Sequence, residues 1–179
     1  LRSFMLFDTS SIGSGQSVSA AVYSFTSSAA TATAVDLTFN IVSSSPASNT
    51  ALVAADFDNV GTTSFGTIES DAVTTDSSTY NDITLNSDGR AAVAVAGVSK
   101  FAVRWEPDRA NSEPSAATSG AGCTMLSADT ASTSKDPKLV VTHAVAADID
   151  NINGIALSSI QAFNGITPAN AQEINGITF

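Results

Sequence analysis

Residues 35–41 have the sequence Val-Asp-Leu-Thr-Phe-Asn-Ile, in which apolar and polar side chains alternate without a break. Successive side chains of a β-strand point to opposite faces of a sheet. This period of two therefore predicts a strand that buries Val35, Leu37, Phe39 and Ile41. The polar residues between them would face water, as on the outer face of an antiparallel sheet.

The same alternation recurs through most of residues 1–145, and clusters of Ser, Thr, Asp, Gly and Pro separate the apolar runs. Short strands with turns at near-regular spacing are typical of sandwiches and jelly rolls. We therefore predict an all-β fold, an antiparallel jelly-roll β-sandwich over residues 1–145. The further expected strands are Leu1–Phe7, Ser17–Phe25, Leu52–Phe57, Tyr80–Leu85, Ala91–Val95, Phe101–Trp105 and Lys138–His143.

One stretch, residues 86–95, is compatible with two structures. Its alanines favour a short helical turn, whereas its β-branched valines favour a strand. Asp88-Gly89 within it is a tight-turn signal.

The pattern changes near Ala146, and residues 146–179 carry an internal repeat. Three Asn-Gly pairs occur 11 residues apart, each bracketed by apolar side chains. Asn-Gly is the strongest signal for a two-residue hairpin loop, because both positions tolerate positive φ. The tail is therefore predicted to form β-hairpins. Its candidate assembly residues are Ile152, Asn153, Gly154, Ile155, Phe163, Asn164, Gly165, Ile166, Ile174, Asn175, Gly176 and Ile177.

Hairpins this small cannot bury a core of their own. The tail must therefore pack either on its own sandwich or on another chain, and the sequence favours neither. Assembly would make the protein a homo-oligomer or join it to other virion or surface proteins.

Composition excludes several classes of function. The formal net charge is −10 with only 7 basic residues, so binding to nucleic-acid phosphates is not expected. No apolar run is long enough for a membrane helix, so we expect no membrane insertion. Cys123 is the single cysteine, which leaves no intrachain disulfide. Few charges and many hydroxyls are typical of secreted and virion proteins.

Catalytic patterns are missing from the sequence, and we expect no enzyme. His143 is the only histidine, and no Gly-x-Ser-x-Gly motif marks a nucleophile. Glu106 and the other glutamates lack the aromatic-lined groove that a glycosidase pair needs.

Two binding sites are conceivable from the residues. Trp105 and Tyr80 would form a sugar-stacking platform if both were exposed together. Asp56 and Asp58 resemble half of a calcium loop, which leaves room for a structural Ca²⁺, although no EF-hand pattern follows. We expect no other metal and no cofactor.

Two segments carry a resemblance to a known family. Residues 2–12, RSFMLFDTSSI, resemble the opening motif of the DNRLRE-type jelly-roll modules, which are grouped with certain carbohydrate-binding modules. Residues 136–142, DPKLVVT, resemble their closing strand, with His143 in place of the usual aromatic residue. The middle of the chain and the Ile-Asn-Gly-Ile tail resemble such modules in bacteriophage and environmental bacterial surface proteins.

This resemblance implies a jelly-roll fold and a surface location without enzymatic chemistry. The family has one or two strands before the opening motif, so we expect either strands upstream of Leu1 or an open sheet edge that seeks a partner. We therefore expect a structural protein on a virion surface or outside the cell, such as a capsid decoration, tail or fibre component. The alternatives are a glycan-binding or adhesion module of a secreted bacterial protein and an extracellular filament subunit.

Overall fold

The computed structural model confirms an all-β fold with antiparallel sheets. It divides into two compact units, Leu1–Ala144 and Val145–Phe179, which are considered separately. The residues that the structure describes are 2–31, 37–113, 122–128, 133–145, 151–152, 155–156, 173–174 and 177–178.

The larger unit contains a four-stranded sheet in the order β1-β7-β4-β5. Its strands are β1 (Arg2–Asp8), β7 (Val98–Trp105), β4 (Thr38–Ser43) and β5 (Gly66–Glu69). Every neighbouring pair is antiparallel. Because β1 and β5 form the two edges, β7 and β4 are the central strands.

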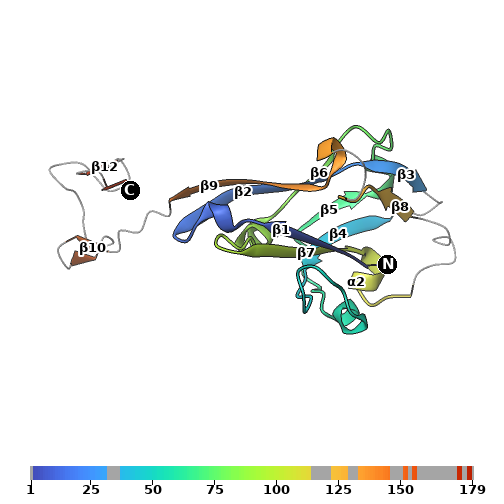
Figure 1. Cartoon of the computed structure of the whole chain (residues 1–179), viewed down its shortest axis with the longest axis horizontal. Coiled ribbons are helices and arrows are strands. Elements are labelled where there is room, and N and C mark those ends of the chain that lie inside the picture. Colours follow the sequence, from blue (N-terminus) through green and yellow to red (C-terminus); the bar gives the residue numbers. More distant parts are fainter. Residues whose placement is uncertain are drawn as a thin grey trace. The chain divides into compact units, whose positions relative to one another are not determined.

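A second set of strands lies over this sheet (Figure 1). It consists of a three-stranded sheet in the order β6-β2-β9 and a β3-β8 pair. These strands are β2 (Gln16–Phe25), β6 (Asn81–Thr84), β9 (Lys138–Val145), β3 (Ser27–Thr31) and β8 (Gly122–Met125).

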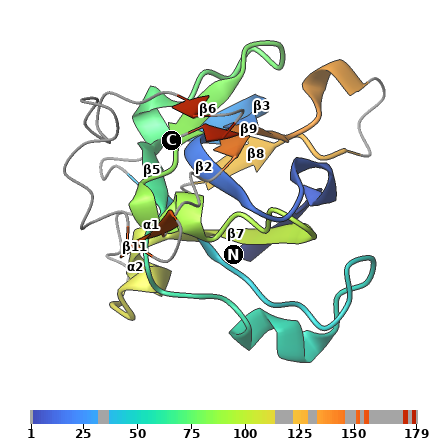
Figure 2. The same cartoon turned by 90° about the vertical axis from the view of Figure 1, so that its left-hand side faces the viewer.

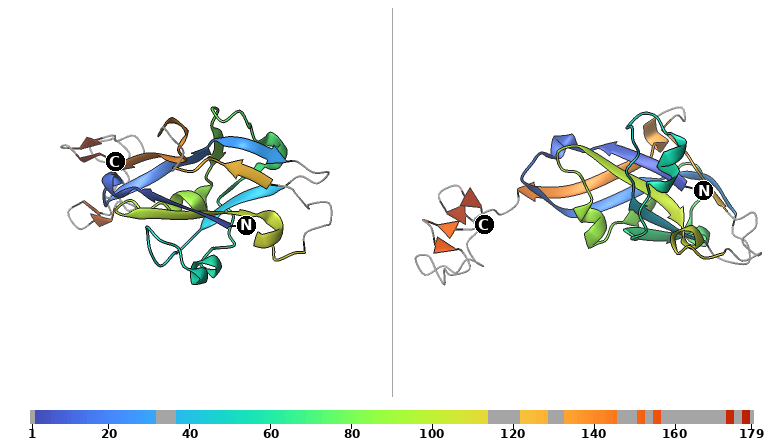
Figure 3. Two further views of the ribbon diagram at one scale, coloured as in Figure 1. Left: turned by 45° about the vertical axis from the view of Figure 1, so that its right-hand side comes forward. Right: turned by 90° about the horizontal axis from the view of Figure 1, so that it is seen from below.

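Strands that follow one another along the chain mostly belong to different layers. The chain passes from β1 in one layer to β2 in the other, and β4, which follows β3, belongs to the first layer again. The left view of Figure 3 shows the strand layers one above the other. Sheet neighbours are consequently far apart in sequence, as for β1 with β7 and β2 with β6. Long-range pairing of this kind is the pattern of Greek-key sandwiches.

The core lies between the layers and is built from inward-facing residues of both, whereas the central strands β4 and β7 are buried on both faces. Tyr23 and Phe25 of β2 are at most 2% exposed, and they face Ile41 of β4 and Phe101 of β7 in one cluster. Aromatic rings join the layers at the edge as well, since Phe7 of β1 meets Tyr23 edge-on at 6.1 Å between ring centroids. Such edge-to-face pairs are favourable beyond the area they bury.

The strand expected at Leu52–Phe57 is wrong. A short 3-10 helix, Ala54–Asp58, lies there, at the tip of a loop that extends away from the strand layers (Figure 2). The buried Asp56 carboxylate explains it, because it accepts hydrogen bonds from the backbone N–H groups of Ala47 and Val53 at 2.8 and 2.9 Å. Aspartate side chains that bond nearby backbone compete with strand pairing.

The prediction of a strand at Ala91–Val95 is also wrong. The alternative prediction for residues 86–95, a short helical turn, is confirmed. Helix α1 (Ser87–Ala91) starts at Asn86, whose side chain accepts a hydrogen bond from the Gly89 N–H. An N-cap of this kind favours helix over strand. The Asp88-Gly89 pair therefore lies in a helix and not in a tight turn.

Three strands were not expected: β3, β5 and β8. They are short and rich in Ser, Thr, Gly and Ala, so they lack the alternating apolar pattern. Pairing with longer neighbours stabilises them instead. Cys123, the single cysteine, belongs to β8, which pairs with β3.

Replacing Gly66 by alanine tests the close approach of the two layers. An added Cβ would lie 2.8 Å from Ile83 Cγ2 and 2.8 Å from the carbonyl oxygen of Thr84. We expect Gly66→Ala to lower the free energy of unfolding by about 1–3 kcal/mol, measured by urea denaturation. Gly97→Ala is the matched control, because nothing lies within 4 Å of its added Cβ. Equal stability of the two variants would contradict this account.

Candidate functional site

Two small hairpins are present in the smaller unit. Strands β10 (Asn151–Ile152) and β11 (Ile155–Ala156) pair antiparallel, with Ile152 opposite Ile155. Strands β12 (Glu173–Ile174) and β13 (Ile177–Thr178) repeat this arrangement, with Ile174 opposite Ile177. The two hairpins share one register and lie two sequence periods apart.

Residues 153–154 and 175–176, which are Asn-Gly pairs in the sequence, separate the paired strands and lie outside the described residues. Each hairpin contributes only two residues per strand, too few to form a core by itself. The remaining assembly candidates lie outside the described residues. They are Asn153, Gly154, Phe163, Asn164, Gly165, Ile166, Asn175 and Gly176.

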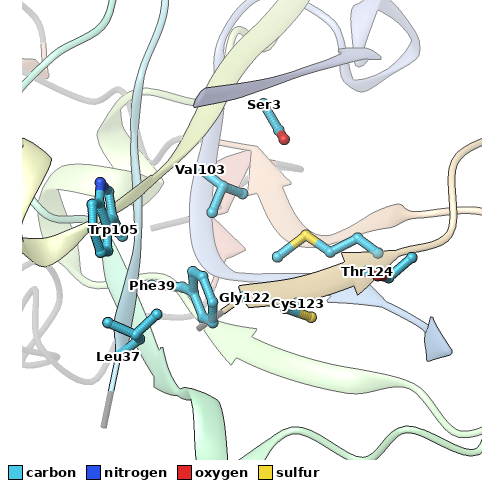
Figure 4. Close-up of a pocket in the computed structure, with 9 residues that line it drawn as sticks. Ser3, Leu37, Phe39, Val103, Trp105, Gly122, Cys123 and Thr124 are labelled. Carbon is cyan, nitrogen blue, oxygen red and sulfur yellow. The ribbon is translucent and has the colours of Figure 1, made fainter. Parts of the chain in front are cut away.

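A cavity of about 420 Å³ lies in the larger unit between the four-stranded sheet and β8 (Figure 4). Leu37, Phe39 and Val103 form its buried floor, each at most 8% exposed. The half-buried Trp105 and Met125 lie around it. The other residues that line it are Ser3, Gly122, Cys123 and Thr124.

The cavity brings together the single tryptophan and the single cysteine of the chain. Trp105 ends β7, and Cys123 lies on β8 opposite Ala30 of β3. Burial raises the pKa of the Cys123 thiol, although a hydrogen bond with Ser27 Oγ at 3.3 Å opposes that shift. The Cys123 thiol therefore stays protonated near neutral pH and brings no charge to the cavity.

The other glycan candidate, Tyr80, has different neighbours. Its hydroxyl donates to the carbonyl oxygens of Ser134 at 3.1 Å and Asp136 at 3.0 Å. The Lys138 ammonium lies 3.8 Å from the centroid of its ring, a cation–π contact that occupies one face. Tyr80 does not line the cavity around Trp105, so the two rings do not share one binding surface there.

At one end of the four-stranded sheet, Asp108 lies between two arginines. Helix α2 (Glu106–Arg109) directly follows β7 and carries this carboxylate. Arg2 of β1 donates to both its oxygens, at 2.9 and 2.8 Å, and Arg104 Nε donates to Oδ2 at 2.8 Å. Bidentate arginine–carboxylate pairs are the strongest of the common side-chain hydrogen bonds.

A second acid–arginine pair extends this network. Glu106 accepts hydrogen bonds from Arg109 Nε at 2.8 Å and from Asn40 Nδ2 at 2.9 Å. Asn40 is only 1% exposed, so the expectation that it faces water is wrong. The reason is that α2 covers the outward face of β4 at this point. We call Arg2, Arg104, Arg109, Glu106 and Asp108 the arginine clamp.

Each arginine of the clamp also donates to the protruding loop. Arg104 Nη1 donates to the Gly61 carbonyl at 2.8 Å, and Arg109 Nη1 donates to that of Thr62 at 2.9 Å. Arg2 donates a hydrogen bond to the Phe57 carbonyl oxygen. The guanidinium carbon of Arg2 lies 4.1 Å from the centroid of the Phe57 ring. The acids of α2 therefore orient the guanidinium groups, which in turn hold the loop to the sheet.

The clamp was missed from the sequence, although one signal was present. Arg104–Asp108 and Glu106–Arg109 have the i,i+4 and i,i+3 spacings of ion pairs within a helical turn. The contribution of Arg2 depends on the β1–β7 register, which places it opposite Arg104. A short stretch of sequence cannot show which residues of two distant strands lie opposite each other.

The calcium candidates Asp56 and Asp58 do not converge on one point. Backbone N–H groups donate to both oxygens of Asp56, whereas the Asp58 side chain is 90% exposed, 3.8 Å from Arg2. Within the part of the chain that the structure describes, no three His, Cys, Asp or Glu side chains cluster as metal ligands do. His143 Nδ1 lies at the end of β9, 3.1 Å from Gln16 Oε1.

Searches of family models, curated proteins and solved structures give no match to this chain. No helix among the described residues has the length and apolar character needed to cross a membrane.

Replacing Asp108 tests the clamp. Asp108→Asn keeps the shape of the side chain but removes the charge that faces Arg2 and Arg104. We expect the free energy of unfolding to fall by about 2–3 kcal/mol, because two partly buried guanidinium groups lose their anion. The control is Asp82→Asn on the exposed face of β6, where a change within about 0.5 kcal/mol is expected.

Acid should weaken the fold through the same groups. The hydrogen bond from Arg2 is the largest cause that lowers the pKa of Asp108, and that from Arg109 lowers the pKa of Glu106. Their contribution is complete above the unfolded-state pKa of about 4 and is lost as pH falls through the folded-state values. We expect urea-unfolding free energies to fall below about pH 4, and to fall less steeply in Asp108→Asn. Parallel pH curves for the two proteins would refute this.

Proposed function

We propose that this protein is a non-enzymatic structural protein that works by assembly through its Ile-Asn-Gly-Ile tail. The observation that carries the proposal is the pair of hairpins with Ile152 opposite Ile155 and Ile174 opposite Ile177. Each hairpin is too small to bury its isoleucines alone, and repetition at a fixed period multiplies one weak contact. A tail of repeated apolar hairpins is suited to bind neighbouring subunits.

The larger unit is proposed to be a jelly-roll sandwich that carries this tail. Antiparallel pairing of β1 with β7 and of β2 with β6, with the chain alternating between layers, supports that assignment. The resemblance of residues 2–12 and 136–142 to the DNRLRE-type modules agrees with it.

We place the protein on a virion surface or outside the cell, as a capsid decoration, tail or fibre component. The low charged fraction of 13% and the many hydroxyl side chains support this location. The resemblance to bacteriophage surface modules points the same way. The expected partners are further copies of this chain or other virion proteins, without a cofactor.

Isoleucine-to-serine changes in the full chain test this proposal. We expect the unaltered protein to form a defined oligomer in light scattering, and the fourfold variant Ile152→Ser, Ile155→Ser, Ile174→Ser, Ile177→Ser to be monomeric. The reason is that the variant removes apolar area from both hairpins but leaves the Asn-Gly loops.

Ala156→Ser with Thr178→Ser is the matched control in the same strands, and it should remain oligomeric. The thermal midpoint of the larger unit should be the same in all three proteins. A monomeric unaltered protein, or a fourfold variant that still assembles, would show that the tail is not an assembly device.

A further inference from the structure

The cavity between β8 and the four-stranded sheet has no charged side chain among the described residues that line it, from Ser3 to Met125. This is notable because the clamp arginines are close in sequence, with Arg104 between the lining residues Val103 and Trp105. Arg104 is engaged with Asp108 on the other face of β7. Alternation along β7 therefore places the charge outside and leaves an apolar interior.

The cavity also interrupts an otherwise closely packed core. Phe25, Ile41 and Phe101 are at most 1% exposed. By contrast Trp105, Met125 and Cys123 are only half-buried and line the cavity. Protein cores rarely leave a gap of this size, since unfilled apolar space is destabilising.

We propose that this cavity is a binding site for a neutral, largely apolar small molecule. Its volume of about 420 Å³ lies within the range of small-molecule pockets. The floor of Leu37, Phe39 and Val103 offers dispersion contacts and no hydrogen bond. An anionic ligand would meet a chain of net charge −10 without a cationic lining group.

A sugar fits this lining less well than an apolar ligand. Among the lining residues that the structure describes, Ser3 and Thr124 are the two with hydroxyl side chains. A bound sugar would leave several hydroxyl groups without partners against the apolar floor, which is costly. Ser3 lies at the β1 side of the cavity, where one polar group of a ligand would meet it (Figure 4).

Two reporters in the cavity make the test specific. Trp105 and Cys123 are the only tryptophan and the only cysteine of the chain, and both line this space. Protection of Cys123 from thiol alkylation reports on this site, whereas energy transfer from Trp105 reports a probe bound anywhere in its neighbourhood. A probe bound elsewhere would not affect both signals.

The experiment titrates the full chain with the neutral fluorophore N-phenylnaphthylamine. We expect saturable binding with energy transfer from Trp105, and at least a tenfold slower alkylation of Cys123 by iodoacetamide at saturation. No binding, or binding without protection of Cys123, would overturn the proposal. Quenching of Trp105 by neutral sugars in the absence of probe binding would overturn it in favour of a glycan site.

Two substitutions complete the design. Ser3→Phe places a ring at the β1 side of the cavity and should weaken probe binding at least tenfold. Thr67→Phe, on the exposed face of the opposite edge strand β5, should leave binding unchanged. Equal effects of the two, with both proteins folded by circular dichroism, would refute the site.

A third protein separates this proposal from the assembly of the tail. The fourfold isoleucine-to-serine variant should bind the probe as the unaltered chain does, whatever its oligomeric state. If the probe binds only to that variant, the cavity receives the tail of a neighbouring copy and the small-molecule site is wrong.

Discussion

The carboxylate of Asp108, bonded by Arg2 and Arg104, joins the parts of the larger unit that have least support of their own. It fixes the edge strand β1 to the central strand β7 and anchors the short helix α2. Through the same guanidinium groups it attaches the protruding loop at the carbonyl oxygens of Phe57 and Gly61. A negative charge shared by two arginines is thus a central constraint in a chain with few basic residues.

Strict alternation made the long strands predictable. Residues of β1, β2, β4, β6, β7 and β9 could be located because each strand buries one face against the other layer. The prediction failed at Leu52–Phe57 and at Ala91–Val95, where the Asp56 and Asn86 side chains bond nearby backbone N–H groups and fold the chain locally. It also failed for β8, whose strand conformation depends on its partner β3.

The candidate sites also differ in whether the sequence alone could predict them. The tail repeat could be recognised from the sequence because an Asn-Gly pair and its flanking residues are local, and the antiparallel pairs Ile152–Ile155 and Ile174–Ile177 lie at two of its three copies. The cavity could not, since it combines Ser3, Phe39, Trp105 and Cys123 from four separate strands. Their proximity follows from sheet order, which no single stretch of sequence contains. Trp105 was a candidate binding residue because of its aromatic ring, but the residues around it could be identified only from the structure.

The arginine clamp holds the protruding loop by the carbonyl oxygens of Phe57, Gly61 and Thr62. Every amino acid carries a carbonyl group, so these three hydrogen bonds do not depend on the side chains of the loop, whereas the contact between Arg2 and the Phe57 ring does. Leu52 and Val53 at its tip are more than half exposed and are not used to hold it. Leu52 and Val53 are therefore free to diversify during evolution while the attachment of the loop stays constant, as in scaffolds that present variable segments on a fixed framework.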